Sequence, residues 1–220
     1  MELVSAAKMR RAVNAVLSSR PYATLAWNMV SEIGKVTEVS HHSLLKRPAS
    51  HARMAIICIT SDRGLCSGFN AQVIKAADRF RQKQEAGGME CDFVVVGKKG
   101  QDAARRMRWN MIAAFSGFSA VPSIAEIQPV AALATQDFVK GVYGSVYLAY
   151  TDFISTLKQS PRLHQLLPLA RMDAAGETGK KSASEFRYEY SFEPSPRAVL
   201  DVMLPRLVET QVYQALYESS

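Results

Sequence analysis

The side chains that most suggest chemistry lie between Ser61 and Asn70, in the segment SDRGLCSGFN. This segment follows the apolar run Met54–Thr60 and leads into an amphipathic helix. Gly64 and Gly68 could let backbone amides at a helix start surround a phosphate group. However, the segment has neither the Gly-Lys-Ser/Thr ending of a P-loop nor the G-x-G-x-x-G spacing. We therefore favour a tight structural turn and keep a small α/β nucleotide-binding enzyme as the alternative.

The reactive side chains of this loop do not form a catalytic set. Asp62 and Arg63 are adjacent, so their side chains point apart in an extended backbone, which favours a turn-capping aspartate and a surface arginine. Cys66 could be activated by Arg63 and a helix N-terminus, yet no histidine is placed to pair with it, and a semi-buried cysteine is favoured. We expect no catalytic residue, since nucleophile, base and orienting group do not converge.

Histidines and cysteines give little support to a metal site. His41, His42 and His51 share one basic linker and are expected to stay solvated, and His164 is expected at the surface or half-buried. The cysteines are odd in number and lack C-x-x-C spacing: Cys58, Cys66 and Cys91. These features favour free thiols in a reducing compartment. No metal and no cofactor are expected.

The chain is strongly basic, with a net charge of +7 at pH 7 and a pI near 9.4. Such a balance suits nucleic acid, a membrane surface or an acidic protein partner. The clusters Lys8–Arg11 and Arg105–Arg108 lack interleaved aromatic residues for base stacking, so nucleic-acid binding is the weakest reading. An acidic protein groove suits the first cluster and a solvated helix face the second. Neither a membrane span nor a signal peptide is expected, while 48% apolar residues suffice for a core.

Alternating strands and helices position these residues. Short apolar runs predict strands, and longer periodic segments predict helices, with Asn70 as the N-cap of a helix from Ala71. The predicted strands are 54–60, 92–96, 112–115, 145–150 and 187–192, and the predicted helices between them are 71–80, 101–108 and 124–138. This order predicts an α/β body with a mostly parallel sheet.

Long amphipathic helices are expected at both ends. The first covers about residues 2–39, with a kink at Pro21, and should project from the body. The last begins with Ser195 as N-cap and Pro196 at the first helical position, and it carries an apolar stripe from Leu200 to Ala215. Two such helices are best paired as an antiparallel coiled coil. The predicted organisation is helix 1–39, linker 40–53, α/β domain 54–192 and incomplete coiled-coil helix 193–220.

Four sequence blocks, in this order, resemble the gamma subunit of F-type ATP synthases. They are MELVSAAKMRRA with SRPYA, ITSDRGLCSGFN, FISTLKQSPRLHQLLPL, and FEPSPRAVLDVMLPRLVETQVYQALYES. At the turn, Ser67 replaces the first glycine of the family's Gly-Leu-Cys-Gly-Gly. The resemblance implies a Rossmann-like α/β body on an antiparallel coiled coil. Family members extend beyond both ends of this sequence.

The resemblance also implies a function. Family members form the central rotor shaft inside the ring of three alpha and three beta subunits, resting on the membrane c-ring beside epsilon. They couple proton flow to ATP synthesis without nucleotide or catalytic site of their own. The implied location is the cytoplasmic face of a bacterial inner membrane, as part of a peripheral sector. Candidate coupling residues on the matching segments are Met1, Lys8, Arg10, Arg11 and Gln211.

Overall fold

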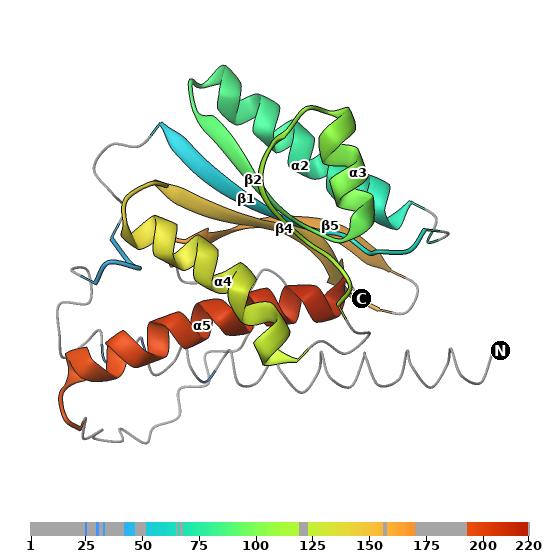
Figure 1. Cartoon of the computed structure of the whole chain (residues 1–220). Coiled ribbons are helices and arrows are strands. Elements are labelled where there is room, and N and C mark those ends of the chain that lie inside the picture. The colour runs from blue at the N-terminus through green and yellow to red at the C-terminus, as the bar shows by residue number, and fades with distance from the viewer. Residues whose placement is uncertain are drawn as a thin grey trace, which may run out of the picture.

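The described residues form a five-stranded sheet covered by helices on both faces (Figure 1). The computed structural model describes residues 42–46, 52–64, 66, 68–118, 123–155, 158–169 and 193–219, together with Leu25, Val30 and Ile33. The predicted helix 2–39, apart from those three residues, and the predicted strand 187–192 lie outside the described residues.

The sheet is mostly parallel, as predicted. Strand β1 (Arg53–Ile59) pairs in parallel with β2 (Glu90–Val96) and β4 (Ser145–Phe153), and β2 pairs in parallel with β3 (Asn110–Phe115). Strand β5 (Gln159–Leu167) closes one edge antiparallel to β4, giving the order β3-β2-β1-β4-β5. The loops that follow β1, β2, β3 and β4 therefore all leave from one end of the sheet.

Each face of the sheet carries its own helices (Figure 1). Helices α2 (Phe69–Ala86) and α3 (Lys98–Arg106) cover one face, and α4 (Ile124–Val139) and α5 (Pro196–Glu218) cover the other. Strand β1 is buried on both sides from its second residue onward, because its alternate side chains enter two separate apolar clusters. That double burial explains why its sequence is a continuous apolar run.

Three local expectations need correction. Helix α3 begins at Lys98 rather than at residue 101, and the N-cap of α2 is Gly68 rather than Asn70, whose side chain bonds elsewhere. Strand β5 was not expected, because Pro161 and alternating polar residues hide it, and an edge strand tolerates both.

His42 is not solvated, contrary to expectation. Its ring is mostly covered, its Nε2 lies 3.2 Å from Asp201 Oδ1 on α5, and its Nδ1 accepts from the Leu44 amide at 3.1 Å. This arrangement suits the neutral ring protonated at Nε2. Burial lowers the pKa of His42, against the opposing effect of Asp201. Buried Leu44 then accepts a backbone bond from Leu169, so this turn of the linker is fixed to the body.

Candidate functional site

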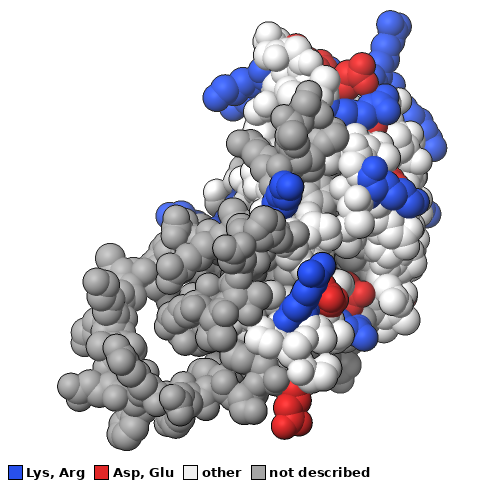
Figure 2. Space-filling view, turned by 90° about the vertical axis from the view of Figure 1, so that its left-hand side faces the viewer, with Lys and Arg blue, Asp and Glu red and all other residues white. Residues whose placement is uncertain are grey.

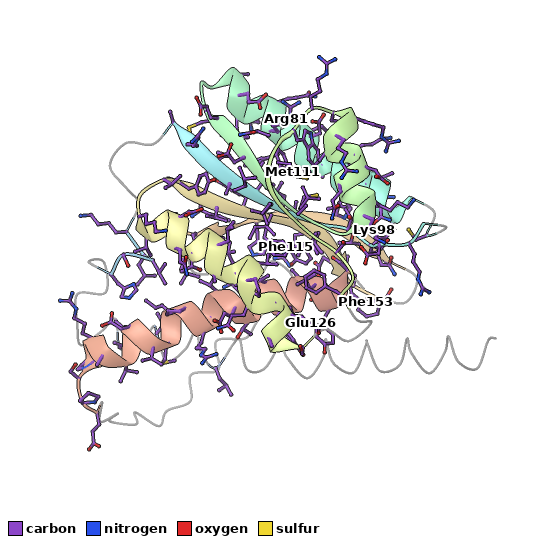
Figure 3. All side chains as sticks on the ribbon, in the orientation of Figure 1. Arg81, Lys98, Met111, Phe115, Glu126 and Phe153 are labelled. Carbon is purple, nitrogen blue, oxygen red and sulfur yellow. The ribbon has the colours of Figure 1, made fainter. Side chains whose placement is uncertain are left out.

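Asp62 ties together three segments at the carboxyl end of the sheet. Its Oδ1 accepts a hydrogen bond from the Lys98 amide at 2.9 Å, and its Oδ2 accepts one from the Gly117 amide at 2.7 Å. Helix α3 has no side-chain cap of its own, so Asp62 supplies a negative charge at its N-terminus from 36 residues away. Lys98 stands at this end of α3 in Figure 3. The sequence suggested that Asp62 caps its own turn, whereas in the structure it caps a distant helix.

Thr60 fills the glycine turn between β2 and α3. The Thr60 hydroxyl donates to the Val96 carbonyl and accepts from the Gly100 amide, both at 2.8 Å. Gly97 has φ of +92°, and a Cβ at this position would stand 2.1 Å from the Thr60 carbonyl oxygen. Only glycine therefore fits at Gly97, for conformation and for space. The turn encloses the chain's own backbone.

Asn70 closes the loop that follows β1. Its Oδ1 accepts from the Ser61 amide at 3.0 Å, and its Nδ2 donates to the Ser61 hydroxyl at 2.8 Å. The same amide nitrogen lies 3.1 Å from the sulfur of Cys66, which is half-buried as expected. Asn70 therefore holds the two ends of the loop together from the first turn of α2.

These contacts give the glycine loop a structural role. In the loop Ser61–Asn70, the Ser61 amide donates to Asn70 Oδ1 and the Phe69 amide to the Cys66 carbonyl. At the neighbouring start of α3, the amides of Lys98 and Gly100 donate to Asp62 and Thr60. The described residues contain no group of three or more metal-ligating side chains. The cysteines are free, and burial raises the pKa of Cys58 to about 12 and that of Cys91 to about 11, away from thiolate chemistry at neutral pH. The geometry of this loop supports a structural turn rather than a catalytic or phosphate-binding site.

The terminal helix α5 is the second candidate. Ser195 caps it as predicted, with its hydroxyl accepting from the Ala198 amide at 3.2 Å, and Pro196 takes the first helical position. The expected apolar stripe is buried to 2% exposure or less, from Leu200 to Ala215. The stripe enters the same cluster as β1, β4 and α4. Helix α5 is therefore packed on the body along this stripe.

The N-terminal segment contributes to that cluster. Val30 and Ile33 are helical, are at most 5% exposed, and belong to the cluster that contains the stripe of α5. Leu25, in contrast, is 63% exposed. Helical residues from both ends of the chain thus share one core, which the proposed pairing of the terminal helices requires.

Gln211 lies inside the body, at 6% exposure on α5. It stands beside His164 of β5, whose two ring nitrogens are shielded from solvent and have no hydrogen bond of good geometry. Burial lowers the pKa of His164 to about 4, with a smaller effect of Arg162 in the same direction. His164 is half-buried, as expected. The position of Gln211 favours internal packing, and its coupling role stays a prediction.

The remaining coupling candidates, Met1, Lys8, Arg10 and Arg11, lie outside the described residues. Sequence reasoning also missed the partners of Asp62, because these lie in two other loops. A signal did exist: each glycine turn follows a parallel strand, so all of them meet at one edge of the sheet. Within the described part of the chain, no helix has the length and apolar content to cross a bilayer.

Comparisons with known proteins agree over the whole sequence. The sequence model of the family described as ATP synthase matches residues 1–220. The ATP synthase gamma chain of Herpetosiphon aurantiacus is 36% identical over 226 residues, covering 100% of this chain and 74% of the relative. That of Pelotomaculum thermopropionicum is 37% identical over 220 residues, covering 100% and 73%. The fold is similar to a chain of the Tetrahymena thermophila mitochondrial ATP synthase central stalk and c-ring structure, with a TM-score of 0.71, 18% identity, and coverage of 100% and 90%.

Proposed function

The chain belongs to the ATP synthase family as a gamma chain, and from this membership we infer that it is the central rotor shaft that couples rotation to ATP synthesis. The observation that carries this function is the match of all 220 residues to gamma chains at 36–37% identity. The nucleotide-binding alternative, which would use the Ser61–Asn70 loop, is not favoured, since the Ser61 amide donates to Asn70 and Asp62 accepts from the amides of Lys98 and Gly117.

The geometry suits transmission of torque. Helix α5 has 23 residues, which is about 35 Å at a rise of about 1.5 Å per residue. Leu204, Leu207, Val208 and Val212 are at most 1% exposed, and burial of each stabilises the joint by about 1.5–3 kcal/mol. A shaft helix that shares its core with the sheet turns together with the body.

The finer parts of the proposal concern partners and place. We propose that the chain acts within a ring of three alpha and three beta subunits, beside epsilon and above the c-ring, on the cytoplasmic face of a bacterial inner membrane. Lys8, Arg10 and Arg11 would face acidic loops of the beta subunits, with Met1 near the same surface. The chain would contribute stiffness and charge, and no catalytic side chain.

Reconstitution tests the function. The chain is mixed with alpha and beta subunits, and the products are separated by size before ATP hydrolysis and bead rotation are measured. We expect a complex that hydrolyses ATP and rotates a bead attached at exposed Arg105 of α3 through an R105C substitution. Calorimetry of the isolated chain with millimolar ATP should show no heat of binding.

A matched pair of variants separates coupling from folding. The triple charge reversal K8E/R10E/R11E should impair coupled rotation, whereas K46E/K140E/K158E, at exposed sites of the described body, should not. Failure of a correctly folded chain to assemble with alpha and beta subunits would contradict the rotor function. If the two triple variants had equal effects, the coupling role of Lys8, Arg10 and Arg11 would be contradicted, but the rotor function would not.

A further inference from the structure

The excess of positive over negative charge among the described residues comes from one layer of the molecule. Between Asp62 and Arg108, which include α2 and α3, there are ten Lys and Arg residues against six Asp and Glu residues. The rest of the described residues hold seven of each. Figure 2 shows blue side chains in excess of red ones over the upper part of that view, at the level of α2 in Figure 1. The excess charge therefore belongs to the face of the sheet opposite α5.

Carboxylates in this layer are already engaged within the chain. Asp62 accepts from two backbone amides, and Asp78 and Glu85 both pair with Arg81 of the same helix. Asp78 also accepts from the indole of Trp109 at 2.8 Å. The three others are Glu90 and Asp92, which pair with Arg53, and Asp102, which lies 3.8 Å from Arg105. These acids are not free to neutralise further cations.

Three cations form a straight row on α2. Lys75, Arg79 and Lys83 are exposed and follow one another at steps of four residues, so they project from one side of the helix over about 12 Å. No carboxylate among the described residues lies within ion-pair distance of any of the three. Lys83 also suits the negative end of the helix dipole, but Lys75 and Arg79 are too far from that end to benefit. Like charges at this spacing repel each other, so the row costs stability unless something binds it.

The surroundings of the row favour a protein over lipid or nucleic acid. The exposed residues beside it on α2 are small or polar, such as Ala71, Gln72 and Gln82, so no apolar side chain is available to enter a bilayer. Phe80 is half-buried and Trp109 is buried, so the described layer offers no aromatic platform for bases. A regular row of cations matches carboxylates at the same helical spacing.

We propose that the row Lys75, Arg79 and Lys83 is a docking surface for an acidic helical segment of a partner protein, with Glu or Asp at every fourth position. Each cation would face one carboxylate at the rim of the contact, and the binding would be salt-dependent. The proposal does not depend on the rotor function, because it concerns the opposite face of the sheet from α5 and uses none of the residues of the shaft.

The test measures binding of the full chain to a labelled peptide by fluorescence anisotropy. The peptide has about 20 residues, with Glu at every fourth position in an Ala and Gln host, and capped ends. We expect binding at low salt, and a loss of about tenfold or more in affinity for K75E/R79E/K83E, which corresponds to about 1.4 kcal/mol. The neutral variant K75Q/R79Q/K83Q should show an intermediate loss, and circular dichroism should show that both variants are folded.

The control K46E/K158E/R197E makes the same change in net charge at exposed residues outside α2, and should lose less than about threefold. An equal loss in both reversals would overturn the proposal, because net charge alone would then explain binding. No binding of the peptide at low salt would also overturn it. If the chain bound anionic vesicles or random duplex DNA through the row but did not bind the peptide, the partner would be a lipid surface or a nucleic acid instead of a protein.

Discussion

Removal of the Asp62 carboxylate tests whether the glycine loop is a joint between segments. Asp62→Ala deletes the bonds from the Lys98 amide at 2.9 Å and from the Gly117 amide at 2.7 Å. A hydrogen bond to a charged group contributes about 1.5–3 kcal/mol, and loss of a helix cap alone costs about 0.5–2 kcal/mol. Both bonds lie at an exposed site, so the low end applies and the expected total loss is about 2–3 kcal/mol. Asp62→Asn keeps one acceptor without charge and should lose about half as much.

Urea unfolding of the full chain measures the change, at constant pH and salt. The midpoint should fall while the slope of free energy against urea stays constant, because the folded body keeps its extent. Hydrogen exchange adds a local readout, since the amides of Lys98 and Gly117 should lose protection before the rest of α3. Asp102→Ala is the matched control on the same helix: its oxygen lies 3.8 Å from Arg105 in solvent, and its removal should cost less than about 0.5 kcal/mol.

Two results would refute this reasoning. An Asp62→Ala protein within about 0.5 kcal/mol of the parent chain would show that water replaces the carboxylate without cost. Unchanged exchange at both amides would show that the bonds do not fix α3 and the Gly117 loop in solution. A gain of nucleotide binding in the variant would instead identify the turn as a cradle that Asp62 closes.

Three further predictions concern the core and pH. Gly97→Ala should cost more than about 2 kcal/mol by urea unfolding, since its Cβ would meet the Thr60 carbonyl at 2.1 Å, whereas exposed Gly88→Ala should cost less. Leu204→Ala, at 0% exposure, should cost about 2–5 kcal/mol. The control Val202→Ala, at an exposed site of the same helix, should cost less than about 0.5 kcal/mol, as surface substitutions do, and equal losses would contradict the packing of α5. His164 has its pKa lowered from 6.5 to about 4, so its stabilising effect is complete above pH 6.5 and is lost as pH falls toward 4; His164→Leu should flatten stability between those values, and an unchanged slope would refute the burial argument.

Sequence patterns predicted most strands and helices of the body because their apolar residues form either an unbroken run or a helical period. Strand β1 is an unbroken apolar run since both of its faces are covered, and α5 has its start fixed by Ser195 and Pro196. Strand β5 escaped because it contains Pro161 and polar residues, and because its pairing with β4 leaves no local pattern in the sequence. The period of α5 predicted its buried stripe, but not that the same stripe also packs on the sheet.

The site was harder to predict than the fold because its contacts are distant in the sequence. Asp62 was recognised as a capping residue, but its acceptors serve amides 36 and 55 residues away. His42 was expected in solvent because its neighbours are basic, and only the fold brings Asp201 to it. The residue type predicts which kind of hydrogen-bond partner a side chain can take. The topology of the fold decides which residue supplies that partner.

The amino end of the sheet has its own polar joint, and this bears on stiffness. Asp92 is 3% exposed and accepts from Asn110 Nδ2 at 2.6 Å and from the Tyr143 hydroxyl at 3.0 Å, with Arg53 Nε at 3.5 Å. These groups come from β1, β2, β3 and the approach to β4. Burial and Asp92 raise the pKa of Tyr143, so its hydroxyl remains a donor at neutral pH.

Directional bonds and apolar burial resist different deformations. Apolar contact is non-directional, so the interface of α5 with the sheet opposes separation more than sliding. Hydrogen bonds to Asp62 and Asp92 are directional, so they oppose relative movement of the segments that they join at the two ends of the sheet. A shaft that must carry twist needs both kinds of resistance in series. The chain supplies burial between α5 and the sheet and supplies polar joints across the sheet, which is why these carboxylates matter to a protein whose work is mechanical.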